Sequence, residues 1–348
     1  MQKPSVTVSS EDIANGHVLC WRLWHQLTKH PEYDVVIPSH ARPDDLCLST
    51  LTLLQKHGVN MCRVHIFVDF AYRNESGVCA YEWYVQTLRR HGFHAVHVRP
   101  GGAGLEGNMS AIRKLFDIGT YLITMSDKVY DVLEVMPGNK EAAVLKPIPM
   151  GALPALWHHG YDVLKAGEFA AWSTNATHSA RTMIANHISR RAGLLDGNMT
   201  GQMVTQSFKD LTIDYGLIYD VEYAAALWHS GQRYVRYRGL CCKHPYRSKG
   251  GQTVNFKDAE ARRRAENSAI KTIAAKYPAV IQFAPKPFAS LKVMQYSFRS
   301  VGPGVLKVKS RSGHGQGRNR RFLLNRPATP QERKAAERLR KKKQRDRQ

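Results

Sequence analysis

Long hydrophobic runs are missing from this sequence. No apolar run approaches the roughly 18 residues that a membrane-spanning helix needs. The first residues also lack the basic start and apolar stretch of a secretory signal. Both absences predict a cytoplasmic protein that has no membrane partner and is not secreted.

Cysteine is sparse and shows no metal or disulfide spacing. The six cysteines form no C-x-x-C pair, so we expect reduced and mostly buried thiols. Cys241 and Cys242 could form a metal corner together with His244, but a fourth ligand is not evident in the sequence. Buried cysteines with a structural role are the favoured interpretation.

Acidic residues are scarce compared with basic ones. The chain has 51 Lys and Arg against 28 Asp and Glu, which gives a net charge of +23. Such a balance predicts a polyanionic partner, most simply a nucleic acid. Residues 305–348 alone contain 16 basic and 3 acidic residues, so over half of the excess lies at the C-terminal end.

What is present is enough for a large core. Apolar residues make up 43% of the 348 residues and charged residues 23%, which excludes wholesale disorder. We expect a helical extension over residues 1–33, a main domain over 34–285 with halves at 34–135 and 136–285, and a basic tail over 286–348. The tail is expected to be partly disordered and to bind nucleic acid through its phosphates, with a localisation or solubility role as the alternative.

Strands and helices alternate in the first half. Apolar runs predict strands at 34–38, 63–68, 94–98 and 121–125, with helices at 44–57, 81–91 and around 109–116. The first of these helices is expected to have Leu48 inside, and the third contains the apolar residues Met109, Ile112, Leu115 and Phe116. The second half predicts a helix near 220–229, a strand over 232–240 and a charged helix over 258–277. This order predicts an α/β fold with a mostly parallel sheet covered on both faces, and a ligand beyond the carboxyl ends of its strands.

The first strand runs into the segment IPSHARP. Ser39 and His40 are candidates to contact a nucleobase or ribose, and Arg42 is a candidate clamp for a diphosphate. An ordinary strand–helix connection with an exposed arginine fits the pattern equally well.

The third strand leads into the glycine-rich loop GGAGLEGN, which ends at Asn108. Its backbone amides could approach phosphate oxygens at the start of the next helix, where Arg113 could reach the same anion. A glycine-rich loop is a weak signal, and a structural turn is the alternative.

The fourth strand ends in acidic residues, in the segment YLITMSDKVYDV. Asp127 and Asp131 could hold a divalent cation, because carboxylate oxygens suit hard metal ions. Lys128 between them would repel a metal but could itself neutralise a leaving diphosphate. From spacing alone a surface turn is favoured.

Two further motifs lie in the second half. Asp220, in the first turn of a predicted helix, is either a helix cap or a general base for a hydroxyl nucleophile. The segment KHPYRSKGGQ combines His244, Lys249, Gly250 and Gly251, and it is either a loop that closes over a phosphate group or a solvated basic loop.

Taken in order, these segments resemble the GT-A glycosyltransferases. More narrowly, VVIPSHARPDD, MSDKVYDV, WSTNATH and KHPYRSKGGQTVNF are similar to the TET-associated glycosyltransferases of bacteriophages and to their base-J relatives. The similarity covers about residues 34–285. It implies a Rossmann-type nucleotide-sugar-binding half, an acceptor-binding half, and a host-cytoplasmic location if a phage encodes the chain.

The resemblance also implies roles for single residues. Ser39, His40 and Arg42 would bind the nucleotide, Asp127 would stand at a degenerate Asp-x-Asp motif, and Asp220 would be the catalytic base. A divalent metal (Mn or Mg) would contact Asp127 and, with less support, His244. The alternative is a metal-independent enzyme in which Lys128, together with Lys249, takes the place of the metal.

The resulting hypothesis is transfer of a sugar from a UDP-sugar, first of all UDP-glucose, to a hydroxymethylated pyrimidine in DNA. Asp220 would deprotonate the acceptor hydroxyl, which would displace UDP from the anomeric carbon. A non-catalytic nucleic-acid-binding protein on the same scaffold is the alternative from another class.

Overall fold

The computed structural model describes residues 32–136, 144–177, 179–180, 183–245, 256–283 and 296–298. All of them belong to one compact unit of the chain, Met1–Val305. None of the helices in these ranges combines the length and the apolar character that a bilayer crossing requires.

An eight-stranded mixed sheet is the centre of this unit, with strand order β3-β2-β1-β4-β9-β7-β10-β8. Its strands are β1 (Tyr33–Pro38), β2 (Val64–Val68), β3 (His97–Pro100), β4 (Tyr121–Met125), β7 (Ala171–Thr174), β8 (Ile188–Ser189), β9 (Met199–Met203) and β10 (Tyr234–Tyr237). Strands β3, β2, β1 and β4 are parallel, and β9 is antiparallel to both of its neighbours, β4 and β7. The predicted α/β class is therefore confirmed, and the sheet at its centre is mixed.

Strand β1 shows why this sheet is covered on both faces. Val35 and Ile37 pack into one hydrophobic cluster and Val36 into another, and all three are fully buried. A run that is apolar on both faces is the pattern of a central parallel strand between two layers of helices.

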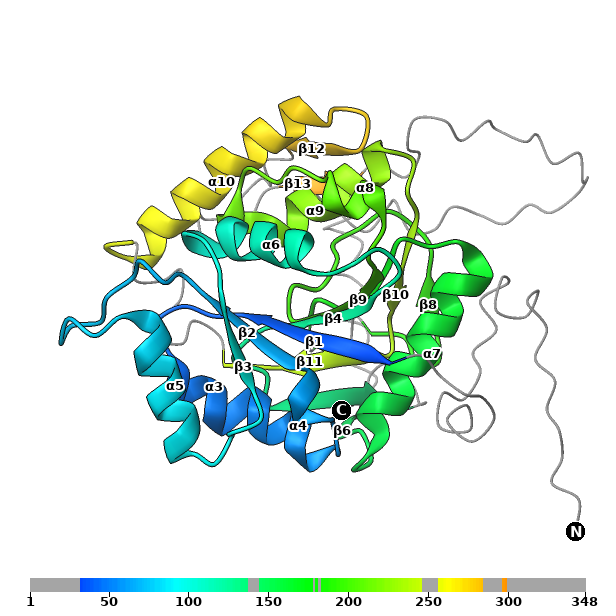
Figure 1. The fold of residues 1–348 in the computed structure, drawn as a ribbon. Coiled ribbons are helices and arrows are strands. Elements are labelled where there is room, and N and C mark those ends of the chain that lie inside the picture. Colours follow the sequence, from blue (N-terminus) through cyan, green and yellow to red (C-terminus); the bar gives the residue numbers. More distant parts are fainter. Residues whose placement is uncertain are drawn as a thin grey trace, which may run out of the picture. The chain divides into compact units, whose positions relative to one another are not determined.

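Helices cover each face of the sheet (Figure 1). One layer contains α3 (Pro43–Leu46), a π-helical turn (Cys47–Leu51), α4 (Thr52–Lys56), α5 (Ala80–Arg90) and α7 (Ala152–Gly167). The other contains α6 (Gly104–Leu115), α8 (Gln206–Lys209), a 3-10 turn (Gly216–Ile218), α9 (Tyr219–His229) and α10 (Ala259–Lys276). A further 3-10 turn, Met61–Arg63, precedes β2.

Two smaller sheets complete the described fold. The first is antiparallel and is formed by β11 (Leu240–Lys243), β5 (Asp131–Val135) and β6 (Leu145–Pro147). The second pairs β12 (Ile281–Phe283) with β13 (Tyr296–Phe298).

Several sequence predictions need correction. The strand expected over 232–240 is two strands, β10 and β11, which belong to different sheets. The strand expected over 94–98 begins only at His97, because Phe93 and Val96 are buried core anchors in the preceding turn.

Two leucines of the predicted helices are exposed. Leu48 is 67% exposed, because the π-helical turn shifts the helical periodicity by part of a turn. Leu115 is 50% exposed and lies at the last residue of α6, where the inner face passes to Phe116.

Candidate active site

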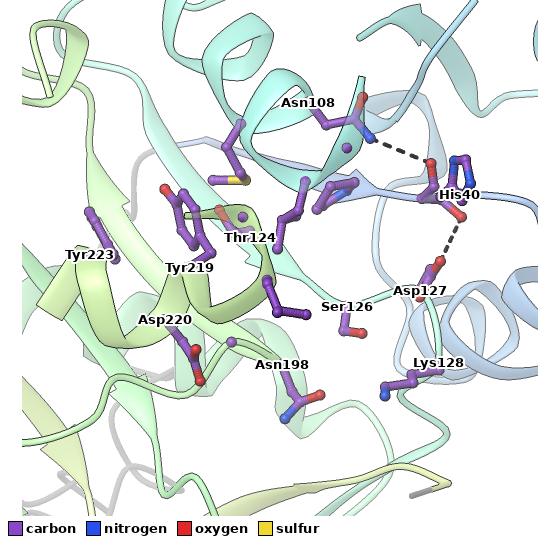
Figure 2. Close-up of a pocket in the computed structure, with 18 of the residues that line it drawn as sticks. His40, Asn108, Thr124, Ser126, Asp127, Lys128, Asn198, Tyr219, Asp220 and Tyr223 are labelled. Carbon is purple, nitrogen blue, oxygen red and sulfur yellow. Dashed lines mark hydrogen bonds between the residues drawn. The ribbon is translucent and has the colours of Figure 1, made fainter. Parts of the chain in front are cut away.

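A cavity of about 620 Å³ lies on the α6–α9 side of the main sheet. Its walls come from the carboxyl ends of β1 and β4, from the first turns of α6 and α9, and from the segment that precedes β9. Figure 2 shows His40, Asp127 and Lys128 on one side of the cavity and Tyr219, Asp220 and Tyr223 on the other.

Most of the predicted site residues line this one cavity. They are Ser39, His40, Arg42, Asn108, Asp127, Lys128, Asp220 and His244. Arg113 does not line it: the side chain is buried in α6, and its Nη1 donates to the Tyr219 hydroxyl at 3.3 Å. Lys249, Gly250 and Gly251 lie outside the described residues.

Asp127 is held by a chain of hydrogen bonds from the first strand. Ser39 Oγ donates to Asp127 Oδ2 at 2.7 Å, and Arg42 Nε donates to the same oxygen at 2.8 Å. The Tyr84 hydroxyl lies 2.7 Å from Ser39 Oγ, whose hydrogen is already donated, so Tyr84 is the donor there. The Asp127 carboxylate, 3% exposed, therefore serves first to fix Arg42 at the cavity wall.

A strained backbone turn brings Arg42 into this position. Ala41 has φ of 55°, in the left-handed region that a residue with a Cβ rarely adopts. Such a conformation costs about 1 kcal/mol and is maintained where the surrounding structure holds it. Here the turn lets the Arg42 side chain point back to Asp127 at the end of β4.

Lys128 presents a half-buried ammonium to the cavity. Burial and the nearby Arg42 guanidinium lower its pKa, Asp127 opposes that shift, and Arg262 adds to it. Within the described part of the chain, Lys128 Nζ has no hydrogen-bond or ion-pair partner. A half-buried ammonium among other cations is the expected feature of an anion site.

His40 occupies the neighbouring part of the wall. Burial lowers its pKa, and the carboxylate of Asp69 at the end of β2 opposes that shift. The ring packs against Tyr72 at a centroid distance of 4.6 Å. In a neutral imidazole one ring nitrogen is a donor and the other is an acceptor, so His40 can donate a hydrogen bond to a ligand or accept one from it.

The glycine-rich loop and α6 are in backbone contact. A Cβ on Gly107 would lie 2.5 Å from the carbonyl carbon of Gly102, so neither position has room for a side chain. At Gly101 a Cβ would meet Asn108 Oδ1 at 1.8 Å. The loop therefore needs glycine because its backbone folds against the first turn of the helix.

Buried polar atoms without partners form the floor of the cavity. The Tyr223 hydroxyl donates to Gln202 Oε1 at 2.5 Å, which orients the amide nitrogen of Gln202 away from Tyr223. That nitrogen, Thr124 Oγ1 and Asn108 Oδ1 have no hydrogen-bond partner among the residues that the structure describes, although all three residues line the cavity. Because buried polar groups are normally paired, this floor is suited to a polar ligand.

Asp220 faces the cavity from the first turn of α9. Burial raises its pKa from 3.8 to about 6, although a backbone hydrogen bond from Val221 to Oδ1 lowers it. The negative charges of Asp196 and Glu266 contribute further to the increase. Among the described residues, Oδ2 of Asp220 has no hydrogen-bond partner, so it is available to a ligand.

Asp196 holds the turn that precedes β9 at the cavity wall. It is 2% exposed, and its Oδ1 accepts from the backbone and side-chain nitrogens of Asn198 at 3.1 and 2.7 Å. Thr174 donates to the other carboxylate oxygen at 2.5 Å. A carboxylate so fully engaged positions the Asp196–Asn198 turn, whereas Asp220 retains a free oxygen.

The described residues do not fit a metal site formed by the protein alone. They contain no group of three or more His, Cys, Asp or Glu that could hold a metal ion. Asp127 Oδ2 is engaged by Ser39 and Arg42, and burial raises the pKa of the Cys241 thiol to about 12, which disfavours a thiolate ligand. The described residues therefore do not supply a complete set of metal ligands.

Several cavity residues were missed by sequence reasoning. They are Asp69, Asp196, Asn198, Gln202, Arg262, Arg263 and Glu266. Asp69 directly follows a strand and Asp196 opens an Asp-Gly-Asn turn, so both carried a usable local signal. Nothing local distinguishes Gln202 from other strand residues.

No protein-family model and no curated protein matches the sequence. Among solved structures, the chain is similar to a mannosyltransferase of Pyrobaculum calidifontis in complex with GDP-Man and Mn2+, with 10% identity and a TM-score of 0.44 over 72% of this chain and 70% of that chain. It is also similar to TarS of S. aureus in complex with UDP-GlcNAc, with 10% identity and a TM-score of 0.43 over 71% and 66% of the two chains.

A third similar structure is GalNAc-T7 with UDP, GalNAc and Mn2+, with 11% identity and a TM-score of 0.38. The match covers 72% of this chain but only 50% of that chain. The layout of the described fold, a parallel β3-β2-β1-β4 block joined to the antiparallel β9, is consistent with a GT-A-like arrangement.

Proposed function

We propose that this chain is a nucleotide-sugar glycosyltransferase that moves glucose from UDP-glucose to a hydroxymethylated pyrimidine in DNA. The observation that carries the proposal is that a candidate general base and two basic side chains line the same cavity. A free oxygen of Asp220, whose pKa is raised to about 6, faces the same space as Arg42 and Lys128. A cavity of about 620 Å³ is also in the size range of small-molecule sites.

The base is Asp220. A carboxylate with a pKa near 6 is ionised at neutral pH and binds a proton more strongly than an ordinary aspartate. It takes the proton of the acceptor hydroxyl, and the acceptor oxygen forms a bond to the anomeric carbon. The bond from that carbon to the diphosphate oxygen breaks, its electron pair leaves with UDP, and the configuration inverts.

The leaving diphosphate gains negative charge during this step. Lys128 and Arg42 lie where they offset that charge, and His40 and the glycine-rich loop next to α6 provide further hydrogen-bond donors. The unpartnered groups of Gln202 and Thr124 supply hydrogen bonds to sugar hydroxyls. Most of the rate increase would come from positioning and electrostatic stabilisation.

The polymer acceptor is supported by charge. A net charge of +23 is more than a small neutral acceptor requires, and it favours a polyanion such as DNA. The similarity of the ordered motifs to DNA-base glycosyltransferases points to the same acceptor.

The test is UDP release from UDP-glucose with DNA containing hydroxymethylcytosine, with and without a chelator. We expect DNA-dependent release by the wild-type chain, and a loss of about 10²–10⁴-fold in kcat for Asp220→Asn. The wild-type kcat should rise with pH through about 6, because Asp220 must be ionised. Asp45→Asn, at an exposed aspartate of α3, is the matched control and should retain full activity.

Retained turnover in Asp220→Asn would remove Asp220 as the base. Binding of DNA without binding of any nucleotide sugar would instead support the non-catalytic nucleic-acid-binding protein. Release that survives the chelator would support Lys128 in place of a metal.

A further inference from the structure

A group of basic side chains lies at the β8–β10 edge of the main sheet and is separate from Arg42 and Lys128. It consists of Arg191, Arg236 and Arg238 with His187, and we call it the arginine cluster. Arg236 Nη2 donates to the backbone oxygen of Arg191 at 3.2 Å, and the backbone nitrogen of Arg238 donates to the backbone oxygen of His187 at 2.8 Å. Burial lowers the pKa of His187, and the positive charges of all three arginines lower it further.

The charge of this cluster is not compensated at Arg236 and Arg191. The Arg236 side chain donates only to neutral acceptors, Ser189 Oγ at 3.4 Å and the Arg191 backbone, and its Nε is buried without a partner. Neither arginine forms an ion pair within the described ranges. A half-buried guanidinium that lacks a carboxylate is costly, so its presence indicates a site that an external anion completes.

The cluster is also held rigidly. The Tyr234 hydroxyl donates to the Gly193 oxygen at 2.7 Å and accepts from the Gly193 nitrogen at 3.0 Å, which fixes the segment after Arg191 to β10. A Cβ on Gly193 would lie 2.6 Å from the Arg236 guanidinium carbon and both of its terminal nitrogens. The guanidinium therefore lies flat against a glycine, in one defined position.

The Arg236 side chain lies on the same face of the main sheet as the cavity. Arg236 and Tyr234 project from the same face of β10, and Tyr234 belongs to the hydrophobic cluster on the α6–α9 face of the sheet. Only a few residues separate Arg191 from Leu194 and Asp196, which line the cavity. Burial raises the pKa of Tyr296, Asp220 raises it further and Arg236 opposes this, so Tyr296 lies near both groups.

We propose that the arginine cluster binds the phosphodiester backbone of the DNA acceptor and positions the target base over Asp220. This inference rests on the proposed function. A second copy of this chain, at a net charge of +23, is repelled by the cluster, whereas a polyphosphate backbone is attracted. Arginine forks match phosphate oxygens in geometry as well as in charge.

The test compares Arg191→Gln and Arg236→Gln with Arg89→Gln in the full-length chain. Arg89 is an exposed arginine of α5 in the other helix layer, so its variant controls for the loss of one charge. We expect each cluster variant to reduce the slope of log K against log salt for DNA binding by about one, and to raise KM for DNA roughly tenfold. Turnover with the free hydroxymethylated nucleoside and the affinity for UDP-glucose should stay unchanged.

The outcomes separate this inference from the proposed function. If the cluster variants match Arg89→Gln in salt slope and in KM for DNA, the cluster is not the backbone site, even where the wild-type chain transfers glucose. If the cluster variants show the expected change of slope but the wild-type chain transfers no sugar, the DNA-binding role of the cluster is supported and the proposed activity fails. Arg191→Gln, at an exposed side chain, keeps the test valid if Arg236→Gln does not fold.

Discussion

Asp220 couples the proposed chemistry to the stability of the chain. Its pKa is raised from 3.8 to about 6, so the folded state binds this proton more strongly than the unfolded state does. The contribution of Asp220 to the free energy of unfolding is thus fully present below pH 3.8 and lost as the pH rises through 6. At neutral pH the ionised Asp220 carboxylate therefore lowers the free energy of unfolding.

Asp220→Asn should therefore stabilise the fold at neutral pH. Asparagine keeps the oxygen that accepts from Val221 but cannot ionise, so we expect an increase of about 1–3 kcal/mol in the free energy of unfolding at pH 8. The increase should shrink towards pH 4. Urea unfolding at both pH values measures it, with Asp45→Asn as the control, and a gain that does not change with pH would contradict the assigned cause.

The sequence allowed cavity residues to be predicted where they directly follow a strand. Ser39, His40, Arg42, Asp127 and Lys128 follow β1 and β4, and all of them line the cavity. Arg113 was misplaced because its reach was judged from helical spacing, whereas its side chain turns inwards to Tyr219. Gln202 could not be predicted, since its role depends on Tyr223, which lies in another element.

At the scale of the element, the contact between the glycine-rich loop and α6 should matter more than helix propensity. Alanine is normally favoured over glycine inside a helix by about 1 kcal/mol. At Gly107, however, a Cβ would lie 2.5 Å from the backbone of Gly102, which cannot move as a flexible side chain could. The gain in propensity is therefore reversed by the contact.

We expect Gly107→Ala to lower the melting temperature and to weaken UDP-glucose binding several-fold. Ser110→Ala in the same helix gains propensity without a close backbone contact and should be neutral or slightly stabilising. Thermal unfolding and calorimetric titration check both variants. A Gly107→Ala chain that is more stable than the wild type would show that the loop does not press against α6.

Elements were predicted well where apolar periodicity was strong and poorly where the chain turned without an obvious breaker. β4 was predicted with its observed bounds, and α9 and α10 nearly so. The turn at Arg238–Gly239 was missed because apolar and aromatic residues continue on both sides of it, so one strand was expected where two sheets meet. The pairing of β4 with β9 was also beyond local patterns, since the two strands are far apart in the sequence.

At the scale of the whole molecule, charge is divided between the compact unit Met1–Val305 and the basic end of the chain. Ending the chain after Val305 removes 16 basic and 3 acidic residues. We expect weaker DNA binding with a flatter salt dependence, and unchanged UDP-glucose affinity, since the cavity lies within the compact unit. Binding assays at several salt concentrations check this, and an unchanged slope would assign DNA binding to the compact unit.

The order of strands in the main sheet has a consequence for biosynthesis. β4 ends at Met125, but its neighbour β9 is complete only at Met203. At about 5–20 residues per second, the ribosome needs roughly 4–16 s to supply this missing partner. During that interval the parallel block β3-β2-β1-β4 has an open edge on a nascent chain, which is the moment at which a chaperone would be most useful to it.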